Sequence, residues 1–339
     1  MRRIKIAQIG INRYSHGPEL FLTMRLRPDI FDLVGYVLVE DERETCAGKI
    51  ASYFGNLAEL SLREVLEDPT IEAVTIETDE IHLLKYAQMA AEHGKHIHME
   101  KPGSQSLADF ERLIETMRRT KKVFHMGYMF RYNPMIVDTV RRVRDGELGH
   151  VFSVEAQMSR HDDRACREWL GAFRGGMMFY LGSNLIDVVL RLQGVPEQVI
   201  PLNTATGIDG VGSEDFGLAV LRYPAATSFV RTSGTEVDGG ARRQIVVLGE
   251  RGTVVISPIE GNDSRTTARM SYYAAADVSM LDENGRTVRE HRDSGPFGRY
   301  EAMICAFAEM VCGERKNPYT LDYELTLFRT VLACCGEPV

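Results

Sequence analysis

Short apolar segments alternate with amphipathic segments from the N-terminus to about residue 127, and this alternation limits the fold more than any other feature of the chain. The apolar segments have the length and composition of strands buried on both faces, and they span residues 4–9, 33–39, 73–76, 96–99 and 123–126. Strands that alternate with helices on this period form right-handed βαβ units around a parallel sheet. We therefore predict a doubly wound α/β domain over residues 1–127.

Local signals mark several helix ends within this first domain. Pro18 suits the first turn of a helix, Ser61 and Glu64 have the spacing of a capping box, and Gly94 stands where a helix would stop. We expect helices over residues 18–26, 42–53, 80–92 and 107–119, and a short helix after Ser61.

The second half of the chain has a different pattern. Segments of alternating apolar and polar residues, bounded by Gly, Pro and Asp, span residues 151–158, 217–221, 228–232, 245–248 and 253–256. Such segments predict an open, mostly antiparallel sheet. Helices are expected over residues 134–144, 178–192, 300–311 and 321–333, and the last of these could pack back on the first domain. The sequence thus predicts an α+β domain over residues 128–339, and two domains suit a chain of 339 residues.

Composition excludes several classes of protein. The net charge is −8 and no basic stripe is visible, which argues against a nucleic-acid partner. The six cysteines form no C-x-x-C pair, so neither a metal site nor a disulfide framework is expected. No apolar run approaches the length of a bilayer span, and Met1 leads directly into a strand pattern without a secretory leader. We expect a cytoplasmic protein without a membrane partner.

Residues 10–17 follow the first strand, where a doubly wound fold cradles the pyrophosphate of a dinucleotide. The segment keeps only Gly10 and Gly17 of a glycine-rich loop, although Asn12 is the next-best residue for a positive φ. An ordinary strand–turn–helix connection would have the same pattern. The position of the segment, between the first strand and the first helix, is what favours a cofactor loop.

The second strand leads into Glu40 and Asp41, where an acidic side chain can accept hydrogen bonds from the adenosine ribose. A carboxylate there repels a 2′-phosphate, so NAD is favoured over NADP, while Arg13 or Arg43 could offset the acids. The alternative interpretation makes both acids the solvated start of a helix.

A more specific motif is Glu100-Lys101-Pro102 at the end of the strand over residues 96–99. A lysine at the carboxyl end of a parallel strand points into the ligand crevice, and proline fixes the turn. Around this motif the chain resembles the glucose–fructose oxidoreductase / inositol dehydrogenase (Gfo/Idh/MocA) family. The similarity continues in the same order through residues 78–82, 127–134, 146–151, 175–176 and 182–187.

The resemblance implies a Rossmann-type domain joined to an α/β domain whose sheet often forms a homodimer or homotetramer interface. It implies hydride transfer between nicotinamide and a sugar, inositol or related polyol. Carried over by position, it implies that the dinucleotide is bound by Gly10, Asn12, Arg13, Asp41, Thr78, His82, Glu100 and Lys101. Lys101 would also touch the substrate oxygen.

The catalytic helix departs from the family pattern. Most catalytic members carry Asp-x-Gly-x-His-x-x-Asp, but here the first Asp is Tyr180, the His is Asn184, and only the last Asp, Asp187, remains. On an α-helix these three residues and Arg191 share one face, which would make either a site or a buried structural network.

The substitution changes the proton chemistry. Alcohol oxidation requires a base, and His is suited because its pKa lies near neutrality, whereas an Asn amide cannot titrate. We therefore expect Lys101 to carry proton transfer with Tyr180 assisting, while Asn184 and Tyr180 bind a hydroxyl or carbonyl oxygen.

Further substrate contacts are expected from Tyr128, Arg131, His161, Trp169 and Asp187. His161 offers a second possible base, although its polar segment is also typical of a solvated loop. Trp169 could stack on a sugar ring or fill the core. Tyr128 and Arg131 could border the nicotinamide or brace the connection between the domains.

Two functions remain open at this point. The first is an NAD(P)-dependent dehydrogenase or reductase of a sugar or polyol, supported by the intact Glu-Lys-Pro motif. The second is a sensor or regulatory protein that binds a dinucleotide and a ligand without turnover, supported by the missing His–Asp pair and the weakened glycine loop.

Overall fold

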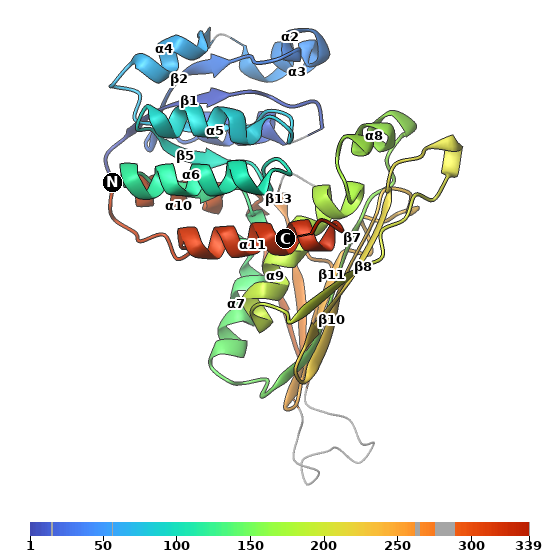
Figure 1. Cartoon of the computed structure of the whole chain (residues 1–339). Coiled ribbons are helices and arrows are strands. Elements are labelled where there is room, and N and C mark those ends of the chain that lie inside the picture. The colour runs from blue at the N-terminus through green and yellow to red at the C-terminus, as the bar shows by residue number, and fades with distance from the viewer. Residues whose placement is uncertain (15, 56, 262–264, 275–288, 339) are drawn as a thin grey trace. The chain divides into compact units, whose positions relative to one another are not determined.

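The computed structural model describes residues 1–14, 16–55, 57–261, 265–274 and 289–338 (Figure 1). The chain divides into two compact units. Unit 1 comprises Met1–Tyr128 and Tyr300–Phe328, and unit 2 comprises Met129–Arg299 and Arg329–Val339.

Unit 1 contains a six-stranded parallel sheet in the order β3-β2-β1-β4-β5-β6. Its strands are β1 Ile4–Ile9, β2 Phe31–Val37, β3 Ala58–Glu59, β4 Ala73–Ile76, β5 His96–Met99 and β6 Phe124–Met126. The order reverses at β1, which is the arrangement of a Rossmann fold. The predicted parallel α/β sheet is therefore confirmed, and only the two-residue β3 was not expected.

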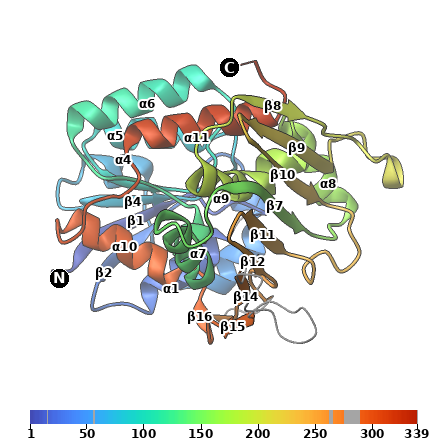
Figure 2. The same ribbon diagram turned by 90° about the horizontal axis from the view of Figure 1, so that it is seen from below.

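The helices of unit 1 are α1 Gly17–Arg25, α2 Glu42–Thr45, α3 Ala47–Lys49, the π-helical turn η1 Ile50–Phe54, α4 Leu62–Glu67, α5 Leu83–Glu92, α6 Leu107–Thr120 and α10 Glu301–Val311. Figure 2 shows α5 and α6 on one side of the strands and α1 and α10 on the other. Ser61 and Glu64 form the predicted capping box, and Gly94 takes a left-handed φ of 67° just beyond α5. The single helix expected over residues 42–53 is instead three short segments.

A row of polar side chains crosses the centre of this sheet. Gln8, Thr75, His98 and His125 are register neighbours on β1, β4, β5 and β6, and all four are fully buried. The Nδ1 atoms of His98 and His125 lie 2.8 Å apart, and the Phe307 ring of α10 lies 5.8 Å from both imidazoles. Burial lowers the pKa of His98 to about 3, so this ring is neutral at pH 7.

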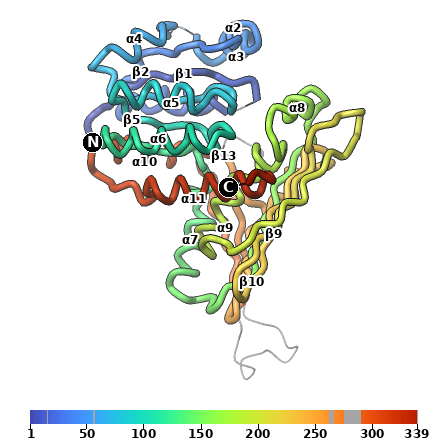
Figure 3. Tube along the Cα trace, in the orientation of Figure 1, coloured from blue at the N-terminus to red at the C-terminus, as the bar shows by residue number. Residues whose placement is uncertain are grey.

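Unit 2 contains an eight-stranded sheet in the order β15-β14-β12-β11-β7-β10-β9-β8. Its strands are β7 Val151–Ser159, β8 Gln198–Pro201, β9 Phe216–Tyr223, β10 Ala226–Ser233, β11 Gln244–Gly249, β12 Gly252–Ile256, β14 Arg269–Ala274 and β15 Arg289–Asp293. Among these strands every pairing is antiparallel except that of β7 with β10. Figure 3 shows the chain passing from β9 into the adjacent β10. The mostly antiparallel sheet was predicted, whereas β8, β14 and β15 were not.

The helical segments of unit 2 are the 3₁₀ turns η2 Met129–Tyr132, η3 Leu170–Ala172 and η5 Ile208–Gly210, the π-helical turn η4 Met178–Gly182, and α7 Pro134–Arg144, α8 Arg164–Trp169 and α9 Ser183–Gln193. A small sheet pairs β13 Arg265–Thr266 with β16 Phe297–Gly298. Helix α9 packs on β7 and β10, and α7 contacts β12. Side chains on the other face of the large sheet, such as Leu218, Val220, Phe229 and Val246, are only half-buried. The last helix, α11 Leu321–Cys334, belongs to both units.

Candidate functional site

Gly10 makes the turn that follows β1 at the carboxyl edge of the unit 1 sheet. Its φ is +85°, and a Cβ atom at this position would lie 2.6 Å from Cβ and 2.7 Å from the backbone nitrogen of Thr78. Glycine is therefore required both by conformation and by the close approach of the next strand connection. This turn brings the loop to the start of α1, where a dinucleotide pyrophosphate would bind.

Glu42 binds the backbone of the same loop. Its Oε1 accepts hydrogen bonds from the amides of Ile11 at 3.1 Å and Asn12 at 3.5 Å, and its Oε2 accepts from Val39 N–H at 2.9 Å. Burial raises the pKa of this carboxyl, although the three amides act in the opposite direction. Two backbone donors that could face an anionic ligand are thus already engaged by a side chain.

Asn12 is buried with a positive φ of 37°, as the sequence predicted for a glycine substitute. Its amide donates to the Thr78 carbonyl at 3.1 Å and to Glu80 Oε2 at 2.9 Å, and its Oδ1 accepts from Tyr14 N–H at 2.8 Å. Burial raises the pKa of Glu80 to about 8, so this side chain is mostly a neutral acid at pH 7. Arg13, next to Asn12, is exposed.

Glu77 is the second fully buried acid near the loop. Its Oε1 lies 3.9 Å from His98 Nε2, and its Oε2 would lie 3.3 Å from a Cβ atom at Gly17, the first residue of α1. Burial and the neighbouring Glu100 carboxylate raise the pKa of Glu77 well above its usual range. The sequence did not reveal Glu42, Glu77 and Glu80, because an acid in a buried position looks like any surface acid in a single sequence.

The two acids after β2 lie in different surroundings. Glu40 has a φ of +52° and accepts hydrogen bonds from Lys85 Nζ at 2.6 Å and Tyr86 Oη at 2.7 Å, and these donors lower the pKa of its carboxyl. His82 Nδ1 lies 3.8 Å from the same carboxylate. Asp41 is exposed and precedes α2. A role of Asp41 at the adenosine ribose therefore stays a prediction, and Glu40 is the acid that the fold holds in place.

The Glu-Lys-Pro motif lies directly after β5. Lys101 is buried and its Nζ lies 3.6 Å from Glu100 Oε1. Gly127, after the next strand, packs against this glutamate, since a Cβ atom there would lie 3.1 Å from Glu100 Oε2. Tyr128 beside it is 1% exposed. The motif thus lies at the same carboxyl edge as the Gly10 loop, where a dinucleotide contacts a Rossmann sheet.

Tyr180 of unit 2 lies in the π-helical turn η4, which packs on β9 and β10. Close packing is allowed by glycine, because a Cβ atom at Gly217 would lie 2.6 Å from Thr232 Oγ1 and 3.0 Å from Met178 Cβ. The Tyr180 hydroxyl accepts a hydrogen bond from Arg160 at 3.2 Å. The Trp169 ring meets the Tyr180 ring edge-on at 5.1 Å. Isolated π-helical turns are frequent at functional sites.

Asp187 and Arg131 contact each other. Arg131 Nε and one terminal nitrogen donate to Asp187 Oδ1 at 3.0 and 2.9 Å, and both side chains are fully buried. Arg191 lies 4.0 Å from the second carboxylate oxygen. The polar face predicted for this helix is therefore partly a buried ion-pair network, and the proposed contacts of Arg131 and Asp187 with substrate stay predictions.

The other predicted residues of unit 2 lie nearer to solvent or to Tyr180. Asn184 is 2% exposed, and its Oδ1 has no hydrogen-bond partner among the described residues. His161 is exposed and bridges to Thr235 at the end of the sheet. Trp169 is half-buried and its ring packs edge-on against the rings of Tyr180 and Phe173.

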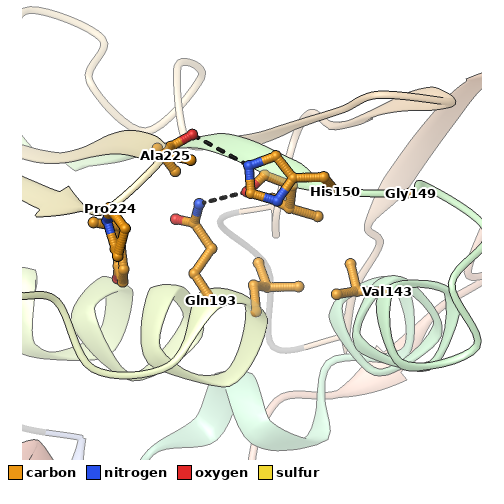
Figure 4. Close-up of a pocket in the computed structure, with 10 residues that line it drawn as sticks. Val143, Gly149, His150, Gln193, Pro224 and Ala225 are labelled. Atoms are coloured by element: carbon orange, nitrogen blue, oxygen red, sulfur yellow. Dashed lines mark hydrogen bonds between the residues drawn. The ribbon is translucent and has the colours of Figure 1, made fainter.

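A separate shallow cavity of about 390 Å³ lies in unit 2 among the ends of α7 and α9 and the turn between β9 and β10. Figure 4 shows His150 and Gln193 side by side in its wall, bonded to the carbonyls of Ala225 and Val151 at 3.2 and 3.1 Å. Its described lining includes none of the predicted site residues.

The wider fold gives no sign of a metal centre or a bilayer span. Within the described ranges, no three His, Cys, Asp or Glu side chains come together as metal ligands. Across the same part of the chain, none of the helices is both long and apolar enough to cross a lipid bilayer.

The Rossmann sheet, the Gly10 turn and the Glu100–Lys101 pair at one edge define a nicotinamide-dependent oxidoreductase, and comparison with known proteins agrees. The chain belongs to the GFO/IDH/MocA family: the model described as "Oxidoreductase family, NAD-binding Rossmann fold" matches residues 4–128, and that of the GFO/IDH/MocA C-terminal domain matches residues 137–255. The family predicted from the colinear motifs is confirmed.

Individual relatives are distant. The uncharacterized oxidoreductase YdgJ of Escherichia coli is 24% identical over 268 residues, which are 76% of this chain and 75% of the relative. The scyllo-inositol 2-dehydrogenase (NAD(+)) of Bacillus subtilis is 40% identical over 86 residues, 25% of each protein. Levoglucosan dehydrogenase, solved with NADH and levoglucosan, matches with a TM-score of 0.79 at 16% identity, over 98% of this chain and 97% of that one.

Proposed function

We propose that this oxidoreductase transfers hydride between NAD and a hydroxyl-bearing carbon of a sugar, inositol or related polyol, or the corresponding keto form. The observation that carries the proposal is the buried Lys101 beside Glu100 at the carboxyl edge of an NAD-binding sheet. The named sugar and inositol dehydrogenases among the similar proteins support the substrate class.

The dinucleotide is assigned to the edge of unit 1. The pyrophosphate is lined by Gly10, Asn12 and Arg13, and the adenosine ribose faces Asp41. The dinucleotide is further bordered by Thr78 and His82, and its nicotinamide ribose is held by Glu100. The bound nicotinamide supplies the hydride acceptor or donor. NAD is preferred, because a carboxylate at Asp41 would repel the 2′-phosphate of NADP.

Proton transfer is assigned to Lys101 with the help of Tyr180. The Lys101 ammonium is a compact group with three rotatable N–H donors, which suits contact with a reacting oxygen. Asn184 binds the reacting oxygen, and its buried Oδ1, without a partner among the described residues, is consistent with a ligand hydroxyl there. The substrate is proposed to contact five further residues, which are Tyr128, Arg131, His161, Trp169 and Asp187. We further propose a cytoplasmic homodimer or homotetramer.

The test is turnover. Purified protein is mixed with NAD or NADP and a panel of sugars, inositols and their keto forms, and absorbance of the reduced nicotinamide is followed. Lys101→Met is expected to lower kcat by about 100-fold or more, the usual contribution of a proton-transfer group. The exposed Lys316→Met is the matched control and is expected to leave kcat unchanged. Full turnover by K101M would exclude Lys101 as the proton carrier.

A second candidate function is a sensor that binds NAD and a ligand without turnover. The replacement of the usual Asp and His by Tyr180 and Asn184 favours it, as does the engagement of two loop amides by Glu42. Calorimetric binding of NAD together with absence of turnover over the whole panel would select this alternative.

A further inference from the structure

Arg160 and Asp162 follow the end of β7 and form a connected polar group with Tyr180. One terminal nitrogen of Arg160 donates to the Tyr180 hydroxyl oxygen at 3.2 Å, and the other lies 2.8 Å from Asp162 Oδ1. The guanidinium carbon is 5.8 Å from the centre of the Tyr180 ring. Asp162 and Tyr180 are buried, and Arg160 is half-buried.

The backbone fixes this group at the ends of two strands. Arg160 N–H donates to the Ser233 carbonyl and Asp162 N–H to the Gly234 carbonyl, both at 2.8 Å, and the Arg160 carbonyl accepts from Glu236 N–H at 3.1 Å. These bonds continue the parallel pairing of β7 with β10 beyond the last ladder residue. The backbone of Arg160 is therefore held by hydrogen bonds to the neighbouring strand, and this fixes the position from which the guanidinium contacts the phenol.

We propose that Arg160 is a positioning residue that stabilises the phenolate form of Tyr180, held in place by Asp162, so that Tyr180 acts as a catalytic acid and base. The proposal rests on the proposed function and changes one part of it: Tyr180 takes the substrate proton directly, and Lys101 contacts the reacting oxygen. An adjacent cation favours the ionised form of an acid.

In the oxidation, the substrate O–H bond breaks as its proton passes to the phenolate oxygen of Tyr180. A bound nicotinamide would accept the hydride from the C–H bond of the same carbon, which would leave a C=O bond. The phenol then returns its proton to solvent, and reduction runs through the same states in reverse.

Other titratable or charged groups surround the pair. The groups that interact electrostatically with Arg160 or Asp162 are His161, Asp163, Cys166 and Arg243. Arg243 is itself neutralised by Glu260 at 2.7 Å, which also accepts from Arg299. Arg160 donates a hydrogen bond to the Tyr180 hydroxyl oxygen, so its replacement tests the proposal.

The decisive measurement is the ionisation of Tyr180, followed by NMR of protein labelled with ¹³C at tyrosine Cζ. The signal absent in Tyr180→Phe identifies the residue. Arg160→Met is expected to move its titration midpoint to higher pH by about one unit or more, whereas Arg160→Lys, which keeps the charge, moves it less. Arg164→Gln on α8, an exposed arginine paired with Glu168, is the matched control and leaves the midpoint unchanged. If R160M does not fold, Arg160→Gln replaces it.

Kinetics provide the second arm. In R160M, the part of the pH profile of kcat that reports the ionisation of Tyr180 is expected to shift by the same amount as the NMR midpoint. When R160M is combined with Y180F, it is expected to lower kcat little further. An unchanged NMR midpoint in R160M, or an equal loss of kcat with and without the tyrosine oxygen, would overturn the proposal. Failure to turn over any substrate would defeat the proposed function instead, while the NMR titration would still decide the coupling of Arg160 to Tyr180.

Discussion

The carboxyl group of Glu80 has no exposed surface and shares a hydrogen bond with Asn12 in the cofactor loop. Its pKa rises from 4.5 to about 8 because burial disfavours the charged form. The folded protein therefore binds a proton that the unfolded chain has lost between these two pH values. Stability contributed by this neutral acid is present below about pH 4.5 and declines as the pH rises toward 8.

Glu80→Gln keeps the shape and the acceptor oxygen but removes the titration. We expect the variant to unfold with a free energy within about 1 kcal/mol of the wild type at pH 5 and to be more stable by about 3–5 kcal/mol at pH 9, since one unit of pKa difference corresponds to about 1.4 kcal/mol. Urea unfolding at both pH values measures this. Glu67→Gln, an exposed acid on α4, is the control; equal stabilities of E80Q and wild type at pH 9 would contradict the prediction.

Single candidate residues came from the sequence only where a motif marked them, and their roles in a site stay predictions. Lys101 and Glu100 came from Glu-Lys-Pro, and Tyr180 and Asn184 from the altered catalytic helix. The contact of Arg160 with Tyr180 joins a strand end to a helix 20 residues later, and no local pattern reports it. The ion pair of Arg131 with Asp187 spans 56 residues and was hidden for the same reason.

At the level of elements, the sequence predicted the strands of unit 1 well because short runs rich in apolar residues alternate there with amphipathic segments. Strands β14 and β15 were missed because their polar and charged residues obscure the alternation on which the prediction relied. The four-residue strand β8 was missed because it is too short to show an alternation. The turn η4 was expected as ordinary α-helix, because the i+4 and i+5 hydrogen-bond patterns have similar side-chain periodicities. The capping box at Ser61 was predictable because both partners lie within one turn.

The requirement for glycine in the turn at Gly10 can be tested by substitution. Gly10→Ala places a methyl group against Thr78 in a left-handed conformation, so we expect a loss of about 2 kcal/mol or more in unfolding free energy and at least a tenfold weaker affinity for NAD. Urea unfolding and calorimetric titration with NAD measure the two effects.

Gly48→Ala is the matched control for this substitution. Gly48 lies in α3 and needs no left-handed φ, and a methyl group added there would meet no described atom within 4 Å. Alanine at this position is therefore expected to be neutral or slightly stabilising. A G10A protein with the stability and NAD affinity of G48A would show that the turn tolerates a side chain.

At the level of the molecule, the sheet of unit 2 has a face of half-buried apolar side chains turned away from α7 and α9. The proposed homodimer or homotetramer would cover this face. We expect the double variant Val220→Arg and Val246→Arg to shift the mass measured by light scattering after gel filtration toward the monomer, because a buried interface cannot solvate unpaired charges.

Val195→Arg, at a residue that is 60% exposed in the loop after α9, is the control and should keep the wild-type mass. If the wild-type protein elutes as a monomer at every concentration, the proposed homodimer or homotetramer is contradicted. An unchanged mass in the double variant would place the interface elsewhere on the protein.

The polar row of Gln8, Thr75, His98 and His125 has a consequence for the whole of unit 1. Apolar side chains tolerate small sliding movements, but the contact between the His98 and His125 imidazoles can form only when β5 and β6 keep one register. A slip of either strand by one residue would turn one imidazole to the opposite face and leave the other without its partner in the core. The turns that follow these strands include Glu100–Lys101 and Gly127, and their positions along the strand direction are therefore fixed by the register. Hydrogen bonds buried in the middle of the sheet thus fix the position at which Lys101 follows β5.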